Sequence, residues 1–133
     1  MQPIKAKVTK GLLVGSHLET CDNSGAKEIK ITAVLNTKTK KGRVSSCGVG
    51  DIVMAAVKRG KPEMRKQVVW AIIVRQKKEY RRLNGMRIKF EDNSAVVLKD
   101  EKGNPKGTTF KGAIAKEACE RWPAVAKVAG LIV

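Results

Sequence analysis

The stretch EIKITAVL, from Glu28 to Leu35, alternates between apolar and polar residues with a period of two. In an extended chain, alternate side chains point to opposite faces, whereas a helix would bring residues three or four apart together. The sequence therefore predicts a half-buried β-strand here, with Lys30 and Thr32 on its polar face. The residues predicted to face the core are Ile29, Ile31, Ala33 and Leu35.

Three other runs have the character of strands. DIVMAAVK (51–58) and VVWAIIVR (68–75) are continuous apolar runs rich in branched residues, which is typical of central strands, and SAVVLKD (94–100) predicts another strand. Residues that favour tight turns separate the runs, at 23–25, 48–51, 84–85 and 102–105. Short strands at this spacing predict a mainly β protein whose antiparallel sheet closes into a barrel or a sandwich.

The stretch RQKKEYRRLNGMRIKFEDN (75–93) combines seven basic side chains with a hairpin signal, Asn84-Gly85. Beyond the turn, Met86, Ile88 and Phe90 alternate with charged residues. We therefore predict a hairpin whose apolar residues anchor it in the barrel and whose charges project outward.

The C-terminal stretch GAIAKEACERWPAVAKVAG (112–130) changes to a helical period. Pro123 is expected to end one helix at the residue before it and to open a second short helix, which Gly130 closes. Two ion pairs at i,i+4 spacing are predicted on the first helix, Lys116 with Glu120 and Glu117 with Arg121.

The composition indicates a folded domain with a polyanionic partner. A chain of 133 residues with 42% hydrophobic residues suits one compact domain, and no linker or repeat divides it. The formal net charge of +16 opposes compaction unless a polyanion is bound, and small domains usually carry only about 2 to 8 charges. The leading hypothesis is a nucleic-acid-binding protein.

Three segments, 36–43, 58–66 and 75–89, carry almost all the excess charge. Together they hold 16 basic and 2 acidic residues in 32 positions, whereas the other 101 positions hold 12 basic and 10 acidic residues. Loops that meet a phosphate backbone need Lys and Arg with few acids beside them, and charge that only solubilises a protein is not sorted in this way. The cations predicted to bind are Lys38, Lys40, Lys41, Arg43, Lys58, Arg59, Lys61, Arg65, Lys66, Arg75, Lys77, Lys78, Arg81 and Arg82.

Neither secretion nor a membrane is indicated. Cys21, Cys47 and Cys119 are odd in number and far apart, which predicts reduced, buried thiols rather than disulfides or a zinc site. The chain opens MQPIKAKVTK without an apolar secretory core, and no run reaches the roughly 18 apolar residues that span a bilayer. We expect a cytoplasmic protein with no membrane partner.

No catalytic constellation is found. His17 has no neighbouring carboxylate or cysteine pair that would make it a base or a ligand, so a strand histidine is predicted. Gly48-x-Gly50 resembles half of a phosphate-binding fingerprint, but it precedes a strand rather than a helix, so it is interpreted as a barrel turn. Adjacent acids such as Glu91 and Asp92 point to opposite faces of a strand. The sequence predicts no enzyme, no metal and no cofactor.

The few aromatic residues bear on the kind of nucleic acid. Proteins that bind single-stranded nucleic acids stack bases on exposed aromatic side chains. Here Trp70, Phe90 and Trp122 occupy positions expected in the core. Tyr80 lies among basic residues, where it either stacks on a base or covers the stems of its arginine neighbours; both readings stay open. Structured RNA or a duplex held by its backbone fits better than base-by-base reading.

Residues 71–97 carry a pattern of fixed spacing that resembles the signature of the universal large-subunit ribosomal protein fourteen family. The pattern consists of Ala71 with three aliphatic residues, Asn84-Gly85, Phe90, Asn93 and Val96-Val97. The blocks DNSGAKEIKITAVL, GVGDIV and GAIAKEACERWPAVAKVAGLIV also resemble the family, so the likeness covers nearly all of residues 16–133. The chain up to Gly15 and the KKEYRR form of the hairpin depart from it and look archaeal or eukaryotic rather than bacterial.

This resemblance implies a five-stranded antiparallel β-barrel with basic hairpin loops and short C-terminal helices. It implies one domain with an N-terminal extension (1–15), the barrel (16–110) and a C-terminal helical segment (111–133). The cations between 75 and 82 match the family's basic hairpin, and those between 38 and 43 its first basic loop.

The resemblance also implies a set of partners. These are large-subunit rRNA, small-subunit rRNA across the subunit interface, large-subunit ribosomal proteins three and twenty-four (archaeal type), and the anti-association initiation factor that keeps the subunits apart. Residues 116–133 match the part of the family that faces protein partners, which implies that Trp122 is partly exposed. The residues expected on this surface are Lys116, Glu120, Arg121, Trp122 and Val133.

The favoured hypothesis is a structural rRNA-binding protein of the large ribosomal subunit. The alternative is a free-standing architectural nucleic-acid-binding protein that acts on DNA, which the charge allows and the family pattern does not favour. An enzyme that uses RNA as substrate lacks the residues for the chemistry.

Overall fold

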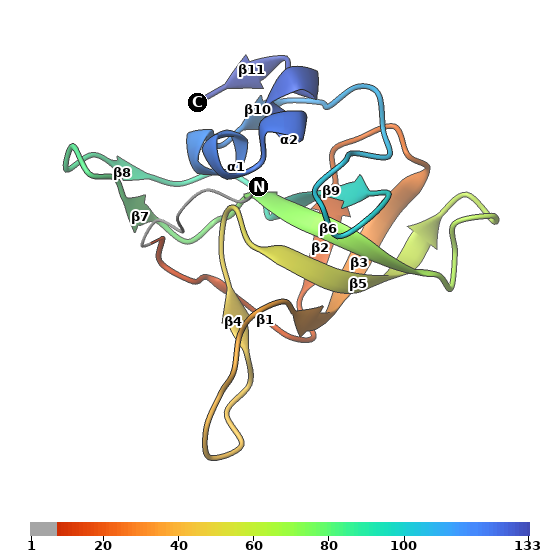
Figure 1. The fold of residues 1–133 in the computed structure, drawn as a ribbon, viewed down its shortest axis with the longest axis horizontal. Helices are drawn as coiled ribbons and strands as arrows, with labels where there is room; N and C mark the ends of the chain where they lie inside the picture. Colours follow the sequence, from red (N-terminus) through yellow and green to blue (C-terminus); the bar gives the residue numbers. More distant parts are fainter. Residues whose placement is uncertain (1–7) are drawn as a thin grey trace.

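A closed barrel of five strands forms the body of the molecule (Figure 1). The computed structural model describes residues 8–133; residues 1–7, the first part of the expected extension, lie outside the described residues. The strands follow the order β2-β3-β5-β6-β9, which confirms the predicted five-stranded barrel. They are β2 (His17–Thr20), β3 (Ala26–Val34), β5 (Ile52–Gly60), β6 (Val68–Arg75) and β9 (Ser94–Leu98).

The barrel is mixed, so the expectation of a purely antiparallel sheet is wrong at one pair. Strand β2 runs parallel to β9, with Glu19 opposite Ser94 and Thr20 opposite Ala95, while the other neighbours are antiparallel. The reason is geometric: an odd number of strands cannot alternate in direction all the way round a closed ring. At least one neighbouring pair must therefore be parallel.

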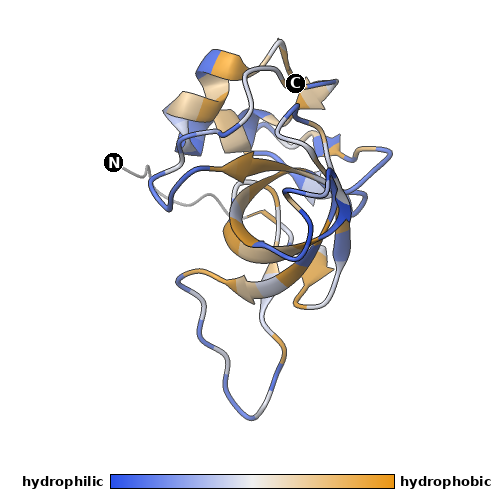
Figure 2. Cartoon of the chain, turned by 90° about the vertical axis from the view of Figure 1, so that its right-hand side faces the viewer, coloured by the Kyte–Doolittle hydropathy of each residue, from blue (hydrophilic) through white to orange (hydrophobic). Residues whose placement is uncertain are grey.

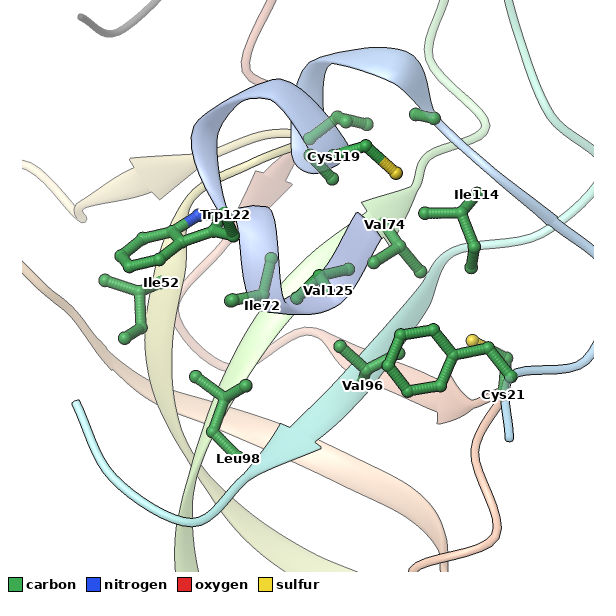
Figure 3. Packing of buried hydrophobic residues seen from close by; sticks show 14 of the residues in the cluster. Cys21, Ile52, Ile72, Val74, Val96, Leu98, Ile114, Cys119, Trp122 and Val125 are labelled. Carbon is green, nitrogen blue, oxygen red and sulfur yellow. The ribbon is translucent and has the colours of Figure 1, made fainter. Parts of the chain in front are cut away.

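The central strands are buried on both faces. The barrel interior is filled by one cluster of residues, which includes Leu18, Ile29, Ile31, Val53, Ala55, Ala71, Ile73, Ala95 and Val97. The intervening residues of β5, β6 and β9 pack against the C-terminal helices (Figure 3) and form a second, outer cluster. It includes Ile52, Ile72, Val74, Val96, Leu98, Ile114, Trp122 and Val125. This double burial explains why the runs 51–58 and 68–75 are continuously apolar. In Figure 2 the barrel strands are mostly hydrophobic and the loops that leave them mostly hydrophilic.

The C-terminal segment forms two short helices, as the change of period predicts. They are α1 (Lys116–Arg121) and α2 (Pro123–Val128), flanked by a parallel pair of short strands, β10 (Ala113–Ile114) and β11 (Leu131–Ile132). Pro123 opens α2, as expected. The predicted Lys116–Glu120 pair is present at 3.7 Å between Nζ and Oε1. The predicted Glu117–Arg121 pair is wrong, because both side chains have partners outside α1.

Two further ribbons leave the barrel. Strand β1 (Leu12–Leu13) pairs with β4 (Ser46–Cys47), and β7 (Tyr80–Arg81) pairs with β8 (Arg87–Ile88). Leu12, which the expected extension contains, is buried in the cluster that fills the barrel. The described part of the extension is therefore packed against the barrel.

The alternation predicted for Glu28–Leu35 holds only in its first half. Ile29 and Ile31 are fully buried in the barrel, but Ala33 is exposed. The pairing of β3 with β5 shifts register between Ile31 and Ala33, as a bulge does. After this shift Val34 packs against the interior cluster and Leu35 against the outer one, so the prediction of Ala33 as a core residue is wrong.

The anchoring of the basic hairpin also differs from the prediction. Met86 is 58% exposed, because it lies in the turn, where its carbonyl accepts a hydrogen bond from the Arg82 amide. Ile88 and Phe90 pack partly against the outer cluster. Asn84-Gly85 does form the turn, with Gly85 at a φ of +88°. The hairpin is thus a separate ribbon that rests on the barrel by its base.

The three thiols and the turn at 48–51 agree with the expectations from the sequence. The thiols of Cys21, Cys47 and Cys119 are buried and do not form disulfides. Burial raises the pKa of the Cys21 thiol to about 11, which keeps it protonated. Residues 48–51 form a turn, closed by a bond of 3.1 Å from the Asp51 amide to the Gly48 carbonyl. Among residues 8–133, no helix is both long and apolar enough to cross a bilayer.

Candidate nucleic-acid interface

The first basic segment, 36–43, is a loop between β3 and β4 that projects from the barrel (Figure 1). Its chain folds back at Lys41 and Gly42, which have φ values of +57° and +69°. The Thr39 hydroxyl donates to the Arg43 carbonyl across the base of this bend at 2.6 Å. The predicted cations of the loop are all exposed: Lys38, Lys40, Lys41 and Arg43.

The second segment, 58–66, begins in β5 and crosses to β6. Met64 is buried in the interior cluster and holds the loop against the barrel. The Arg65 guanidinium donates to the Gly60 carbonyl at 2.9 Å, and Arg59 lies 3.5 Å from the Glu28 carboxylate with most of its side chain in solvent. The predicted cations of this segment are exposed: Lys58, Arg59, Lys61, Arg65 and Lys66.

The third segment, 75–89, contains exposed cations and also cations that are mostly buried in ion pairs. Lys77, Lys78 and Arg81 are exposed, as predicted. Arg75 is not: its side chain is 14% exposed, and its guanidinium forms a two-point ion pair with Asp92, at 3.0 and 3.1 Å. Arg75 also donates to Ser94 Oγ at 2.9 Å. The prediction of Arg75 as a surface cation is therefore wrong; it holds the end of β6 to β9.

Arg82 is captured in the same way. Its Nε lies 2.7 Å from Glu117 Oε1, and its Nη2 donates to the Val133 carbonyl at 2.6 Å. Tyr80 donates its hydroxyl to the other oxygen of Glu117 at 2.7 Å and is only 1% exposed. Burial first, and then the bond to Glu117, raise the pKa of Tyr80. Arg82 is thus not the solvent-facing cation that was predicted.

This network settles the two readings of Tyr80. A ring that is buried beneath the hairpin cannot stack on a base, whereas the Arg82 guanidinium carbon lies 6.0 Å from the ring centroid. Tyr80 therefore supports its arginine neighbour. Together, Tyr80, Arg82 and Glu117 join the hairpin to α1 and to the last residue of the chain.

The three basic segments do not form one continuous patch. In Figure 1, loop 36–43 projects below the barrel, the β5–β6 loop to the right and the β7–β8 hairpin to the left. The barrel between them sets their separation. Such an arrangement suits several phosphate contacts on a folded RNA more than a single groove for one strand.

The expected protein-partner surface has both buried and exposed members. Trp122 is 2% exposed, and its indole N–H donates to the Gly50 carbonyl at 2.8 Å, so the implied partial exposure is wrong. Arg121 pairs with Asp51 at 3.0 Å and is mostly buried. Lys116 and Glu120 are exposed. The exposed apolar residues of this region form one short strip: Leu131, Ile132 and Val133.

His17 lies in β2, as predicted, but it has a carboxylate partner from the next strand. Its Nδ1 is 2.6 Å from Glu28 Oε1, and the side chain is about half exposed. The pair is a cross-strand contact between β2 and β3. Within the part of the chain that the structure describes, no group of three or more His, Cys, Asp or Glu could hold a metal ion.

Comparison with known proteins places this scaffold in a family. The family model for ribosomal protein L14p/L23e matches residues 11–133. The large ribosomal subunit protein uL14 of Nanoarchaeum equitans is 50% identical over 133 residues, which cover 100% of both chains. That of Methanococcus vannielii is 50% identical over 132 residues, 99% of both chains. The chain belongs to this family.

As a member of the L14p/L23e family, the chain is a structural protein of the large ribosomal subunit, which acts in translation in the cytoplasm. The family is not an enzyme family. The resemblance noted in residues 71–97 is thereby confirmed, and the archaeal sources of the relatives agree with the archaeal form of the hairpin.

Sequence reasoning missed the carboxylates that form ion pairs with three of the arginines. Asp92, Glu117 and Asp51 pair with Arg75, Arg82 and Arg121. No local pattern marks these pairs, because the partners are brought together by the barrel and the helices. Charge counting alone therefore overstated the basic surface near the hairpin.

Proposed function

We propose that the chain binds large-subunit rRNA through its three basic segments and so connects several RNA elements. The observation that carries this proposal is the sorting of charge: the segments hold 16 basic and 2 acidic residues, and apart from Arg75 and Arg82 the predicted cations are exposed. Exposed Lys and Arg bind phosphates by direct ion pairs and by release of counterions.

The rigidity of the supports favours this role. Two of the segments are attached to the body of the protein by a buried residue, Met64 beneath 58–66 and Tyr80 beneath 75–89. Cations on a fixed frame meet phosphates at fixed separations, which suits the surface of a folded RNA. The frame is ordered by its own core.

We further propose, from the family, that the chain lies near the subunit interface. Its partners there would be small-subunit rRNA, large-subunit ribosomal proteins three and twenty-four (archaeal type), and the anti-association initiation factor. The C-terminal segment supports this part of the proposal, because the strip 131–133 is exposed and joins the start of α1, where the Lys116 amide donates to the Val133 carbonyl, and because Lys116 and Glu120 on α1 are exposed. Protein interfaces combine an apolar centre with a polar rim in this way.

The test of RNA binding is its salt dependence on an rRNA fragment. If about eight of the exposed cations meet phosphates, log K falls with log[salt] at a slope of about −6 to −7. Replacing Lys77, Lys78 and Arg81 together by Ala is expected to make this slope less steep by about 2 to 3. The protein should stay folded, because all three side chains are exposed.

A matched control removes the same charge elsewhere. Lys111, Lys116 and Lys127 are exposed and lie outside the three segments, so their joint replacement by Ala should change the slope much less. The proposal would be contradicted if both triple variants changed the slope equally, or if the unaltered chain had a slope near −1. A DNA duplex bound as tightly as the rRNA fragment would favour the architectural alternative instead. Co-sedimentation with large subunits in cell extract provides an independent check.

A further inference from the structure

Trp70 lies on a surface that the proposed function does not use. In β6 its neighbour Ala71 enters the barrel, so Trp70 faces outward with Ile72. It packs only partly against the outer cluster and is partly exposed, whereas Tyr80 and Trp122 are buried. The prediction of Trp70 as a core residue is thus only half right.

The helical layer stops short of this residue. Figure 1 shows α1 and α2 over the C-terminal end of β6, and in Figure 3 Trp122 and Val125 lie near Ile52 and Ile72. The start of β6 extends beyond the helices, so Val68 remains 58% exposed. The outward face of the barrel is therefore open around Trp70.

A surface cavity of about 430 Å³ occupies this open face. Across the strands, Met54 pairs with Trp70 and Ala56 with Val68, and both are partly exposed, which extends the apolar floor. The volume is in the range of small-ligand sites and exceeds that of one nucleotide base. The cavity is lined by Val68, Val69, Trp70, Leu98, Lys99 and Lys106.

The charge of the cavity is positive. Lys99 and Lys106 are exposed in its wall, and Lys106 Nζ lies 3.3 Å from Met64 Sδ, which places the basic segment 58–66 beside it. The nearest carboxylate in sequence, Asp100, is not part of the lining; it accepts bonds from the Lys102 amide and the Asn104 side chain. An aromatic ring and two cations in one cavity, with no acid in the lining, fit an anionic planar ligand.

We propose that an unpaired base of the bound RNA stacks on Trp70 while its flanking phosphates contact Lys99 and Lys106. Aromatic rings next to cations bind single-stranded nucleotides through stacking and phosphate contacts. This inference rests on the proposed rRNA binding and adds to it one site that recognises a base rather than the backbone.

The test uses intrinsic fluorescence, because the chain has two tryptophans and Trp122 is buried. The probes are a ten-nucleotide single-stranded RNA and an abasic oligomer of the same length and charge. The RNA is expected to quench the emission of the unaltered protein, and the abasic oligomer is not. Trp70→Phe should abolish the quench and keep most of the affinity.

Trp70→Leu is expected to weaken RNA binding about tenfold and to leave binding of the abasic oligomer unchanged. Leu13→Ala, which removes an exposed apolar side chain outside the three basic segments, serves as the matched control and should change neither. Equal quenching by both oligomers, or unchanged RNA affinity in a folded Trp70→Leu protein, would overturn the inference alone. Failure of both oligomers to bind would also overturn the inference, and the salt dependence of binding to the rRNA fragment would then show separately whether the proposed function stands. The quench of the unaltered protein does not depend on whether the variants fold.

Discussion

At the scale of single residues, arginines with the same charge have different roles. Arg81 is exposed on the hairpin, whereas its neighbour Arg82 is held by Glu117 and the Val133 carbonyl. Removing one partner of a mostly buried pair leaves the other charge without compensation, which costs more than the pair itself contributes. Arg82 therefore acts on the fold, and Arg81 is available for binding.

We expect Arg82→Ala to lower the free energy of unfolding by about 2 kcal/mol, because Glu117 is left mostly buried and unpaired. Arg81→Ala, one residue away, should change it by less than about 0.5 kcal/mol. Urea unfolding followed by circular dichroism measures both. In the double variant Arg82→Ala/Glu117→Gln, the Glu117→Gln change should lower the free energy of unfolding by less than it does in the unaltered protein. Equal stability of the two single variants would contradict the assigned role of Arg82.

At the scale of elements, the junction of β3, β5 and the loop 58–66 depends on Gly60. Its φ is +146°, and a Cβ there would lie 2.5 Å from the Gly25 carbonyl oxygen and 2.9 Å from the Ala26 Cα. Both contacts are backbone atoms at the entry to the paired strand β3, so no side-chain movement can relieve them. The close approach aligns the end of β5 with the start of β3.

We predict that Gly60→Ala lowers the free energy of unfolding by about 3 kcal/mol, because backbone strain adds to a steric clash. Gly15→Ala is the control: its φ of +95° is also unfavourable for alanine, but no atom lies within 4 Å of the added Cβ. That change should cost only about 1 kcal/mol. Thermal unfolding measures the difference, and similar costs for both variants would show that the approach to Gly25 is unimportant.

At the scale of the whole molecule, the barrel separates the basic segments from one another. They project in three directions (Figure 1), so each would meet a different part of a folded RNA. Contacts that lie far apart and share no partners contribute independently to binding.

We therefore expect neutralisation of 36–43 and of 58–66 to have additive effects on the binding of an rRNA fragment. The first variant replaces Lys38, Lys40, Lys41 and Arg43 by Gln, the second replaces Lys58, Lys61 and Lys66 by Gln, and a third combines them. The losses in binding free energy, measured at one salt concentration, should sum to within about 0.5 kcal/mol. A combined loss no larger than that of either variant would mean that both segments contact one shared site.

Much of the fold was predictable because it depends on residues that are close in sequence. The strand runs, the turns and the break before Pro123 were recognisable from periodicity and turn chemistry. The errors arose where tertiary pairing overrides the pattern. The register shift after Ile31 leaves Ala33 in solvent, and closure of an odd-numbered ring makes β2 and β9 parallel.

By itself, the sequence determined the class of protein, the positions of most strands and the sorting of charge into three segments. Only the tertiary structure decided which cations face solvent, because the carboxylates that capture Arg75, Arg82 and Arg121 lie 17, 35 and 70 residues away along the chain. It also decided that Tyr80 is buried and that Trp70 is partly open, since the helical layer covers the end of β6 and not its start. The exposure of a side chain depends on what folds over it, and local periodicity does not contain that information.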